Sequence, residues 1–171
     1  MPPRVVLMGP PGAGKSSVGE ALSLLWDMAY RDTDADVEAR AGKPVADIFV
    51  ELGEPHFREL EHEAVMTALA GHDGVLSLGG GAPLHPATRA ALEAYRDGGG
   101  AVVFLDVSLS AVVPRVGLNT TRPLLLGNPR QQWVALMNAR RPVYESLATV
   151  TVVTDERSPK DIARHIAEEL A

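Results

Sequence analysis

Short apolar runs alternate along this chain with longer segments in which apolar residues recur at helical spacing. Runs rich in β-branched residues favour buried strands, and the longer periodic segments favour amphipathic helices. Their alternation is typical of a parallel sheet covered by helices, so the pattern predicts an α/β fold. The predicted strands are residues 5–8, 28–30, 74–78, 101–105 and 149–153.

Helices are expected between these strands. The first begins at Lys15, directly after a glycine-rich turn. The segment 36–70 is predicted to be mostly helical with a break near 53–55, and a further helix covers 131–147. A final helix is predicted to open at Ser158-Pro159, because serine is a favoured N-cap and proline suits the first helical position.

One segment, 117–129, breaks the pattern: it is rich in Gly, Asn, Thr and Pro and has no hydrophobic period. A long connection of this kind in a small domain is usually functional, so we predict a lid here. The 171 residues suffice for one domain with a hydrophobic core but hardly for two. No linker or internal repeat divides 1–171, which is therefore predicted to be a single domain.

Composition excludes several classes of function. The net charge of −6 offers no basic surface for nucleic acid. The absence of cysteine excludes disulfides and thiolate metal sites. The apolar run near the N-terminus is too short for a signal peptide or a membrane span. We therefore expect a cytoplasmic protein with no nucleic-acid or membrane partner, and a monomer, because no large apolar surface stripe is evident.

Residues 9–16 read Gly-Pro-Pro-Gly-Ala-Gly-Lys-Ser and fit the pattern G-x-x-x-x-G-K-[ST] without a mismatch. In such a loop the backbone N–H groups point at phosphate oxygens beside a helix N-terminus. Lys15 would reach the β and γ phosphates, and the Ser16 hydroxyl would bind Mg²⁺. An accidental glycine turn is the alternative, but the motif follows a predicted strand and opens a helix, as the mechanism requires. The predicted phosphate-binding residues are Gly12, Ala13, Gly14, Lys15, Ser16 and Ser17.

Two carboxylates follow the second predicted strand. Asp32 and Asp34 lie two residues apart, so in an extended chain both project to the same side. One would then hold the Mg²⁺ shell while the other reaches a substrate hydroxyl. Two alternatives remain open: Asp34 only caps the next helix, or Asp106, at the end of the fourth strand, binds the metal instead.

Isolated arginines form the remaining signal: Arg58 on a predicted helix, Arg115 and Arg122 beside the predicted lid, and the pair Arg140-Arg141. Each alone is more often a solvated surface charge. Beside a phosphate loop they suggest two tasks. A planar fork suits a substrate carboxylate, and a mobile arginine suits the charge on a phosphoryl group in transfer.

Taken together, these motifs resemble those of the shikimate kinase family, over almost the whole chain and in the same order. The resemblance implies the P-loop kinase fold, with a parallel sheet of the five predicted strands in the order 2-3-1-4-5 and helices on both faces. The motifs are G-P-P-G-A-G-K-S at 9–16, D-T-D at 32–34, F-R-E-L-E at 57–61, G-G-G at 79–81, R-P-L-L at 122–125 and R-R-P-V-Y at 140–144.

The resemblance also implies the acceptor and its site. Asp34 would bind the shikimate hydroxyls and act as, or beside, the catalytic base. Arg58 and Arg140 would hold the shikimate carboxylate, while Gly80 and Gly81 would present backbone N–H groups. The reaction implied is transfer of the γ-phosphoryl group of ATP to the 3-hydroxyl of shikimate, which gives shikimate 3-phosphate and ADP.

For the nucleotide, the resemblance implies that Asp32 organises Mg²⁺, the expected cofactor, through water. Arg122 would reach the phosphates from the lid, with Lys15 and Asp34 as the other catalytic residues. The base would be lined by Arg115 and the stretch Arg157-Ser158-Pro159. The chain departs from the family pattern nearby: Pro114 and Leu118 stand where Arg and often Gly are expected, which bears on lid stiffness and on the Arg115 contact.

Three other functions fit less well. A gluconate or nucleoside monophosphate kinase would share the phosphate loop, but its chemistry requires no paired arginine clamp beside D-T-D. A guanine-specific switch or adaptor normally carries an N-K-x-D element, which this sequence lacks. A metal hydrolase would need clustered ligands, and the histidines show no such spacing: His56, His62, His72, His85 and His165.

Overall fold

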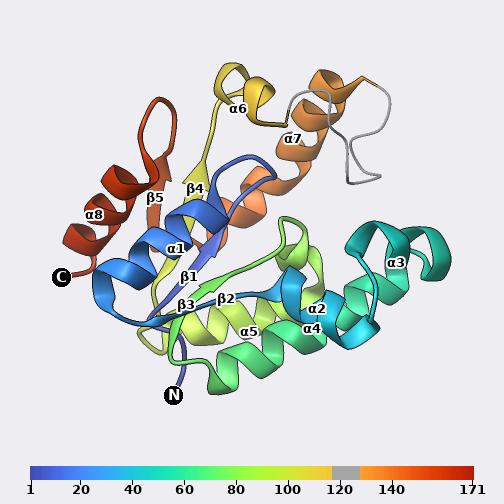
Figure 1. Ribbon diagram of the computed structural model, residues 1–171, viewed down its shortest axis with the longest axis horizontal. Helices are drawn as coiled ribbons and strands as arrows, with labels where there is room; N and C mark the ends of the chain where they lie inside the picture. The colour runs from blue at the N-terminus through green and yellow to red at the C-terminus, as the bar shows by residue number, and fades with distance from the viewer. Residues whose placement is uncertain (117–127) are drawn as a thin grey trace.

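A single parallel sheet of five strands organises the part of the chain that the computed structural model describes, residues 1–116 and 128–171. The strand order is β2-β3-β1-β4-β5 (Figure 1). The predicted fold class and strand order are therefore confirmed. The strands are β1 (Val5–Met8), β2 (Ala29–Asp32), β3 (Gly74–Ser77), β4 (Val102–Asp106) and β5 (Val150–Val153).

The central strands are apolar because helices cover both of their faces. Every residue of β1 and β3 is buried, and Val6 of β1 pairs with Leu76 on one side and Val102 on the other. A parallel strand covered on both sides needs no polar face, which explains the continuous apolar runs. The edge strand β2 is half exposed and carries Arg31 and Asp32, so its apolar signal is weak. For that reason the predicted strand 28–30 stops before the observed end.

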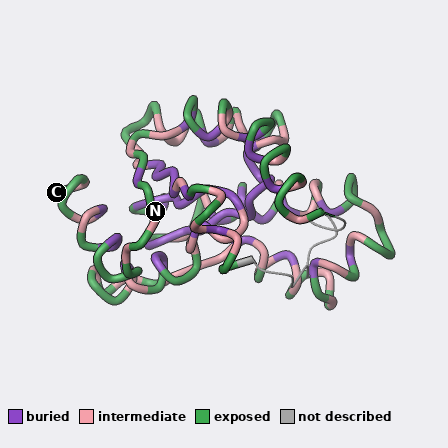
Figure 2. The backbone as a smooth tube through the Cα atoms, turned by 90° about the horizontal axis from the view of Figure 1, so that it is seen from above, coloured by how far each residue is buried: buried purple, intermediate pink, exposed green. Residues whose placement is uncertain are grey.

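Helices pack on both faces of the sheet. Helix α1 packs against α8 on one face, and α4, α5 and α7 follow one another on the other (Figure 1). Buried stretches run through the middle of the molecule, with exposed residues on the outer turns (Figure 2). The described helices are α1 (Lys15–Trp26), α2 (Thr33–Ala41), α3 (Val45–Leu52), α4 (Glu54–Gly71), α5 (Pro86–Asp97), α6 (Leu109–Val116), α7 (Pro129–Leu147) and α8 (Pro159–Glu169), with a 3-10 turn η1 (Ala82–Leu84).

Helices α2, α3 and the start of α4 have a small apolar cluster of their own, apart from the core around the sheet. Phe57 is buried in this cluster, and its ring lies 4.7 Å from that of Phe49. The cluster fixes the first turns of α4 beside the sheet, and with them the neighbouring Arg58. The members of the cluster are Val37, Val45, Ile48, Phe57 and Ala64.

The helix predictions hold in outline and fail in detail. The break expected near 53–55 lies at Gly53, but a second break at 42–44 separates α2 from α3. Helix α7 begins at Pro129, where the Asn128 side chain accepts a hydrogen bond from the Gln131 amide at 3.2 Å. The end of the predicted lid is therefore a helix start, and the rest of it lies outside the described residues. Helix α5 was not predicted.

The sheet places its functional segments at one edge. In a parallel sheet the carboxyl ends of all strands meet there, and ligands bind where the strand order reverses, here beside β1. The glycine-rich loop follows β1, Asp32 ends β2, and the glycines 79–81 follow β3. None of the helices in the described ranges is long and apolar enough to cross a membrane.

Candidate active site

The loop between β1 and α1 has the backbone of an anion-binding turn. The amide of Ala13 donates to the carbonyl of Pro10 at 3.2 Å, which closes the turn. Gly12 and Gly14 have φ of 84° and 93°, a left-handed conformation that favours glycine. Among the described residues, no side chain caps the N-terminus of α1 and no acidic residue lies in its first turn. The N–H groups and the helix dipole therefore favour an anion at this position.

Lys15 adds a full positive charge to this loop. Its ammonium group donates to the carbonyl oxygens of Gly9 at 2.7 Å and Pro10 at 3.0 Å. The charge therefore lies over the loop itself, beside the N-terminus of α1. Phosphate oxygens bound in the loop would meet both the backbone N–H groups and this cation.

A cavity of about 290 Å³ opens next to the loop. It brings together residues that are far apart in the sequence, because the ends of β1, β2 and β3 lie side by side at this edge of the sheet. The phosphate loop forms one wall, and the D-T-D motif and the end of β3 form the other. The lining residues are Pro11, Gly12, Gly14, Lys15, Ser16, Ser17, Asp32, Asp34, Ser77 and Leu78.

The two aspartates reach this cavity by a geometry that differs from the expected one. Asp32 ends β2 and caps α2, and its Oδ1 accepts a hydrogen bond from the Asp34 amide at 2.9 Å. Asp34 lies in the first turn of α2, so the extended conformation assumed for the pair is wrong. The alternative that Asp34 caps the helix is also wrong, because Asp32 is the cap. Both side chains nevertheless line the cavity.

A hydroxyl and a carboxylate, from Ser16 and Asp32, lie on the walls of the same cavity. Within the described ranges no group of three or more His, Cys, Asp or Glu side chains could hold a metal ion. Mg²⁺ usually takes one or two protein oxygens and completes its shell with phosphates and water. The pair therefore fits a Mg²⁺ ion that arrives with a nucleotide better than a metal held by protein alone.

Asp106, the rival metal ligand, has a different partner. Arg141 donates to both of its carboxylate oxygens, at 2.7 Å and 3.0 Å. This contact with Asp106 raises the pKa of Arg141. A bidentate pair of this kind gives Asp106 a structural role at the end of β4.

The glycines after β3 are packed directly against two guanidinium groups. A Cβ atom on Gly81 would lie 2.5 Å from Nη2 of Arg58, and one on Gly80 would lie 3.0 Å from Nη1 of Arg140. Any side chain on Gly81 would therefore displace the guanidinium of Arg58. Two arginines, from α4 and α7, thus converge on one turn of the backbone, as a clamp for an anion requires.

Burial makes this pair of cations costly without an anion. Arg140 is only 3% exposed, and burial lowers its pKa, with the charge of Arg58 acting in the same direction. Glu61 partly offsets this, since its Oε1 accepts a hydrogen bond from Arg58 at 2.7 Å. A ligand carboxylate bound between the two forks would stabilise them further.

Asp34 lies where the cavity meets this arginine pair. A Cβ atom on Gly79 would be 2.7 Å from Oδ1 of Asp34 and 2.5 Å from Oε2 of Glu61. The same Asp34 lines the cavity that contains Lys15. One carboxylate therefore lies beside both the glycine-rich loop and the glycine turn that contacts the two arginines.

Two of the residues predicted to line the nucleotide base, Arg115 and Arg157, lie near the end of β5, and Arg115 contacts the phosphate loop there. Arg115 donates to the carbonyl of Gly12 at 3.0 Å and to the carbonyl of Thr154 at 3.0 Å, which joins the phosphate loop to the end of β5. Arg115 also lines a cavity of about 360 Å³ with Asp155 and Glu156. Arg157 follows in the same loop, where its amide donates to the carbonyl of Thr154 at 3.5 Å.

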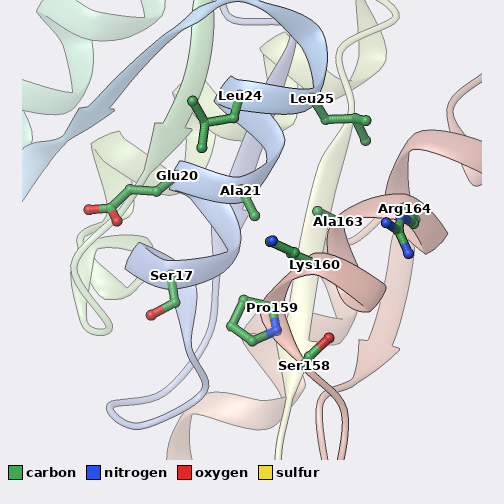
Figure 3. A pocket seen from close by; sticks show the side chains of 10 residues that line it. All are labelled: Ser17, Glu20, Ala21, Leu24, Leu25, Ser158, Pro159, Lys160, Ala163 and Arg164. Carbon is green, nitrogen blue, oxygen red and sulfur yellow. The ribbon is translucent and has the colours of Figure 1, made fainter.

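A groove of about 730 Å³ runs between α1 and α8 (Figure 3). Ser17 and Pro159 line it at the end nearest the phosphate loop, and Leu24 and Leu25 lie at the other end. The structure therefore brings Ser17, Arg115, Arg157 and Pro159 to one side of the loop. Arg122 falls outside the described residues.

Comparison with known proteins decides between the candidate families. The family model for shikimate kinase matches residues 11–171 of this chain. A shikimate kinase of Thermobifida fusca is 54% identical over 168 residues, which cover 98% of this chain and 95% of that protein. The chain belongs to the shikimate kinase family.

Solved structures agree with this membership. The shikimate kinase from Acinetobacter baumannii, solved in complex with shikimate, matches 99% of this chain and 93% of its own, with a TM-score of 0.92 and 31% identity. A gluconokinase from Sinorhizobium meliloti also matches 99% of this chain, with a TM-score of 0.60 and 24% identity. At 24% identity, the similarity to the gluconokinase shows a shared fold and nothing more.

Three residues of this shikimate kinase site were not predicted. Glu61 lies three residues after Arg58 on α4, and Tyr144 lies four residues after Arg140 on α7. Both spacings place side chains on one helix face, so a search for helical neighbours of the arginines would have found them. The indole N–H of Trp133 donates to the carbonyl of Pro11 at 3.3 Å, a contact that no local pattern indicates.

Proposed function

We propose that this chain transfers the γ-phosphoryl group of MgATP to the 3-hydroxyl of shikimate. The observation that carries the proposal is the place of Asp34: it lines the cavity of the phosphate loop and lies beside Gly79, next to the glycines that contact Arg58 and Arg140. An acceptor with a carboxylate at one end and a hydroxyl at the other would span these two features. Membership of the shikimate kinase family supports the same reaction.

At the nucleotide, the loop N–H groups and Lys15 bind the β and γ phosphates. Ser16 and Asp32 would hold the Mg²⁺ ion that comes with ATP, Asp32 through water, and the ion would offset phosphate charge. Arg122, which lies outside the described residues, remains part of the proposal as a cation that acts on the phosphates. These groups act by position and charge, because phosphoryl transfer requires little covalent help from the protein.

At the acceptor, Arg58 and Arg140 bind the carboxylate, and the N–H groups of Gly80 and Gly81 bind ring substituents. Asp34 then accepts the proton of the 3-hydroxyl. The oxygen of that hydroxyl forms a bond to the γ phosphorus, and the bond from this phosphorus to the bridging oxygen of ADP breaks. The products are shikimate 3-phosphate and ADP.

Further parts of the proposal concern the base, the assembly and the location. Arg115, Arg157 and Pro159 line the adenine. The contact of Arg115 with Gly12 and the place of Pro159 beside Ser17 support this part of the proposal. Residues 1–171 act as one catalytic domain and as a monomer. The absence of cysteine is compatible with a reducing cytoplasm as the location.

A substrate panel tests the proposed acceptor. ADP release is measured with MgATP and, in parallel, shikimate, quinate, gluconate, AMP or CMP. We expect substantial turnover with shikimate alone. AMP and CMP have no carboxylate for the arginine pair, and membership of the shikimate kinase family favours shikimate over the other two carboxylates, quinate and gluconate. Preference for gluconate or a nucleoside monophosphate would contradict the shikimate assignment and leave a phosphate-loop kinase of another specificity.

A change of Arg140 tests the carboxylate clamp. Loss of one partner of a buried charged pair costs about 3–5 kcal/mol, so Arg140→Ala should raise KM for shikimate by at least about a hundredfold and leave KM for ATP unchanged. Arg140→Lys keeps the charge but loses the planar fork, and should also raise KM. The methyl ester of shikimate should be a very poor substrate of the wild-type enzyme.

The adjacent arginine offers a matched control for this test. Arg141 is bound to Asp106 and belongs to no part of the proposed clamp. Arg141→Lys should therefore leave both KM values near those of the wild type. Equal effects of the two lysine variants, or indifference to esterification, would refute the clamp.

A further inference from the structure

The side chain of Tyr144 ends beside two parts of the proposed carboxylate site, the Arg140 guanidinium and the Gly80 backbone. Tyr144 lies on α7, one helical turn after Arg140, and is only 1% exposed. Its hydroxyl donates a hydrogen bond to the carbonyl of Gly80. The Arg140 guanidinium lies against the same Gly80, and its interaction with this hydroxyl opposes the lowering of the Arg140 pKa by burial. Toward arginine, which only donates, the hydroxyl can only be an acceptor.

One hydroxyl group therefore joins a side chain of the clamp to the backbone of the glycine turn. It has one proton to give and lone pairs to accept, so it can donate to Gly80 and accept from Arg140 at the same time. The ring of Phe104 lies 5.0 Å from the ring of Tyr144, from the neighbouring strand β4. This packing holds the tyrosine ring, and hence the position of its hydroxyl.

Gly80, the acceptor of this bond, is packed on two sides. A Cβ atom on Gly80 would lie 3.0 Å from Nη1 of Arg140, 3.3 Å from the carbonyl oxygen of Gly9 and 3.4 Å from Cδ of Pro11. The glycine turn therefore lies between the arginine and the phosphate loop. A shift of the turn relative to Arg140 would change the shape of the proposed carboxylate site and the distance from it to the loop.

We propose that Tyr144 is a positioning residue for the acceptor carboxylate: its hydroxyl holds the Arg140 fork and the Gly80 backbone in a fixed relation. The inference rests on the proposed function, in which Arg140 binds that carboxylate. Tyr144 itself touches no substrate in this arrangement. It sets the geometry in which a buried, planar donor meets a planar acceptor, where a small misplacement is costly.

A second, partly buried tyrosine provides an example of a purely structural hydroxyl in this chain. Tyr95 lies on α5, and its hydroxyl donates to the carbonyl of Pro3 at 2.8 Å. Pro3 precedes β1, so this bond lies at the amino ends of the strands, at the opposite edge from the site. Burial raises the pKa of both tyrosines, that of Tyr95 to about 12. Tyr95 is thus a reference for loss of a hydrogen-bonded tyrosine hydroxyl away from the site.

The test compares Tyr144→Phe with Tyr95→Phe in the full-length enzyme. Phenylalanine keeps the ring and its packing and removes only the hydroxyl. A hydrogen bond to a charged group is worth more than an ordinary one, so Tyr144→Phe should raise KM for shikimate about tenfold. We expect kcat at saturating shikimate and KM for ATP to remain near their wild-type values. Tyr95→Phe should lower the melting temperature without change in either KM.

Equilibrium titration with shikimate separates a weaker site from a smaller folded fraction. The stoichiometry reports the folded fraction and the Kd reports the site, so Tyr144→Phe should show full stoichiometry and a raised Kd. The loss should also depend on the carboxylate. The ratio of kcat/KM for shikimate to kcat/KM for its methyl ester should therefore be smaller in Tyr144→Phe than in the wild type. An unchanged KM and Kd, with only lower stability or a lower active fraction, would overturn the inference.

Arg140→Lys in the same series distinguishes failure of the carboxylate clamp from failure of the positioning role of Tyr144. If Arg140→Lys raises KM for shikimate and Tyr144→Phe does not, the clamp stands and the role of Tyr144 is refuted. If neither variant raises KM, the clamp itself fails and the inference fails with it. Raised KM for both, with Tyr95→Phe unaffected, supports the positioning role.

Discussion

Replacement of Lys15 by alanine should lower turnover by at least about a thousandfold, because a charge aimed at the reacting phosphates is lost. The ammonium group lies over the phosphate loop, at 2.7 Å from the carbonyl of Gly9, and no loop residue can replace its charge. Loss of this cation should affect the transition state more than the ground state, since negative charge shifts toward the β–γ bridge during transfer. The measurement is kcat with saturating MgATP and shikimate.

Two further variants make this result interpretable. Lys15→Met keeps the aliphatic stem and should be as inactive as Lys15→Ala, which assigns the loss to the charge. Lys43→Ala removes a lysine that pairs with Glu51 on the surface of α3 and should keep normal turnover. Circular dichroism and thermal unfolding establish that each variant is folded. Near-normal turnover of a folded Lys15 variant would refute the phosphate-loop assignment.

Asp34→Asn should lower kcat by about a hundred- to ten-thousandfold while ATP binding persists, because a general base contributes a factor of this size. The amide is nearly isosteric with the carboxylate but cannot accept a proton. Since Asp34 lies in α2 and Asp32 provides the cap, the helix start should survive the change. The measurements are kcat and the Kd for ATP of the folded variant.

Neighbouring carboxylates supply the comparison for Asp34. Asp36 lies on the same helix and pairs with Arg31 at 2.6 Å, so Asp36→Asn should leave turnover almost intact. Asp32→Asn should instead raise the Mg²⁺ concentration needed for half-maximal rate, through its proposed place in the metal shell. A harmless Asp34→Asn together with a crippling Asp32→Asn or Asp106→Asn would reverse the roles given to these residues.

The glycine turn after β3 forms the boundary between the phosphate loop and the proposed acceptor site. Gly80 lies against Gly9 and Pro11 of the loop, and its carbonyl accepts the hydrogen bond of Tyr144. Trp133 of α7 donates to the carbonyl of Pro11, so the helix that carries Arg140 also supports the phosphate loop. One helix therefore contacts both proposed substrate sites, which would place donor and acceptor in a common frame.

Residue patterns alone do not show which of the two adjacent arginines of α7 faces the site. Arg140 and Arg141 are identical in type, and residue patterns alone assigned neither of them a direction. The resemblance to shikimate kinases selected Arg140, and the structure places Arg140 at the glycine turn and Arg141 on Asp106. Successive helical residues point about 100° apart, so only the packing of α7 on the sheet decides which one faces the site.

The sequence by itself determined the five strands, most of the helices and the phosphate loop, because strand and helix periodicity and a glycine-rich turn are local properties of the chain. It therefore predicted β1 without error and the capped start of α8 at Ser158. Only the tertiary structure decided which residues come together in the candidate site. Arg58, Arg140 and Asp34 lie on three helices, and their convergence depends on long-range strand pairing and on the close approach that the glycines after β3 allow. Contacts of that range leave no periodic trace in the sequence, since each partner is chosen by the fold and not by its neighbours along the chain.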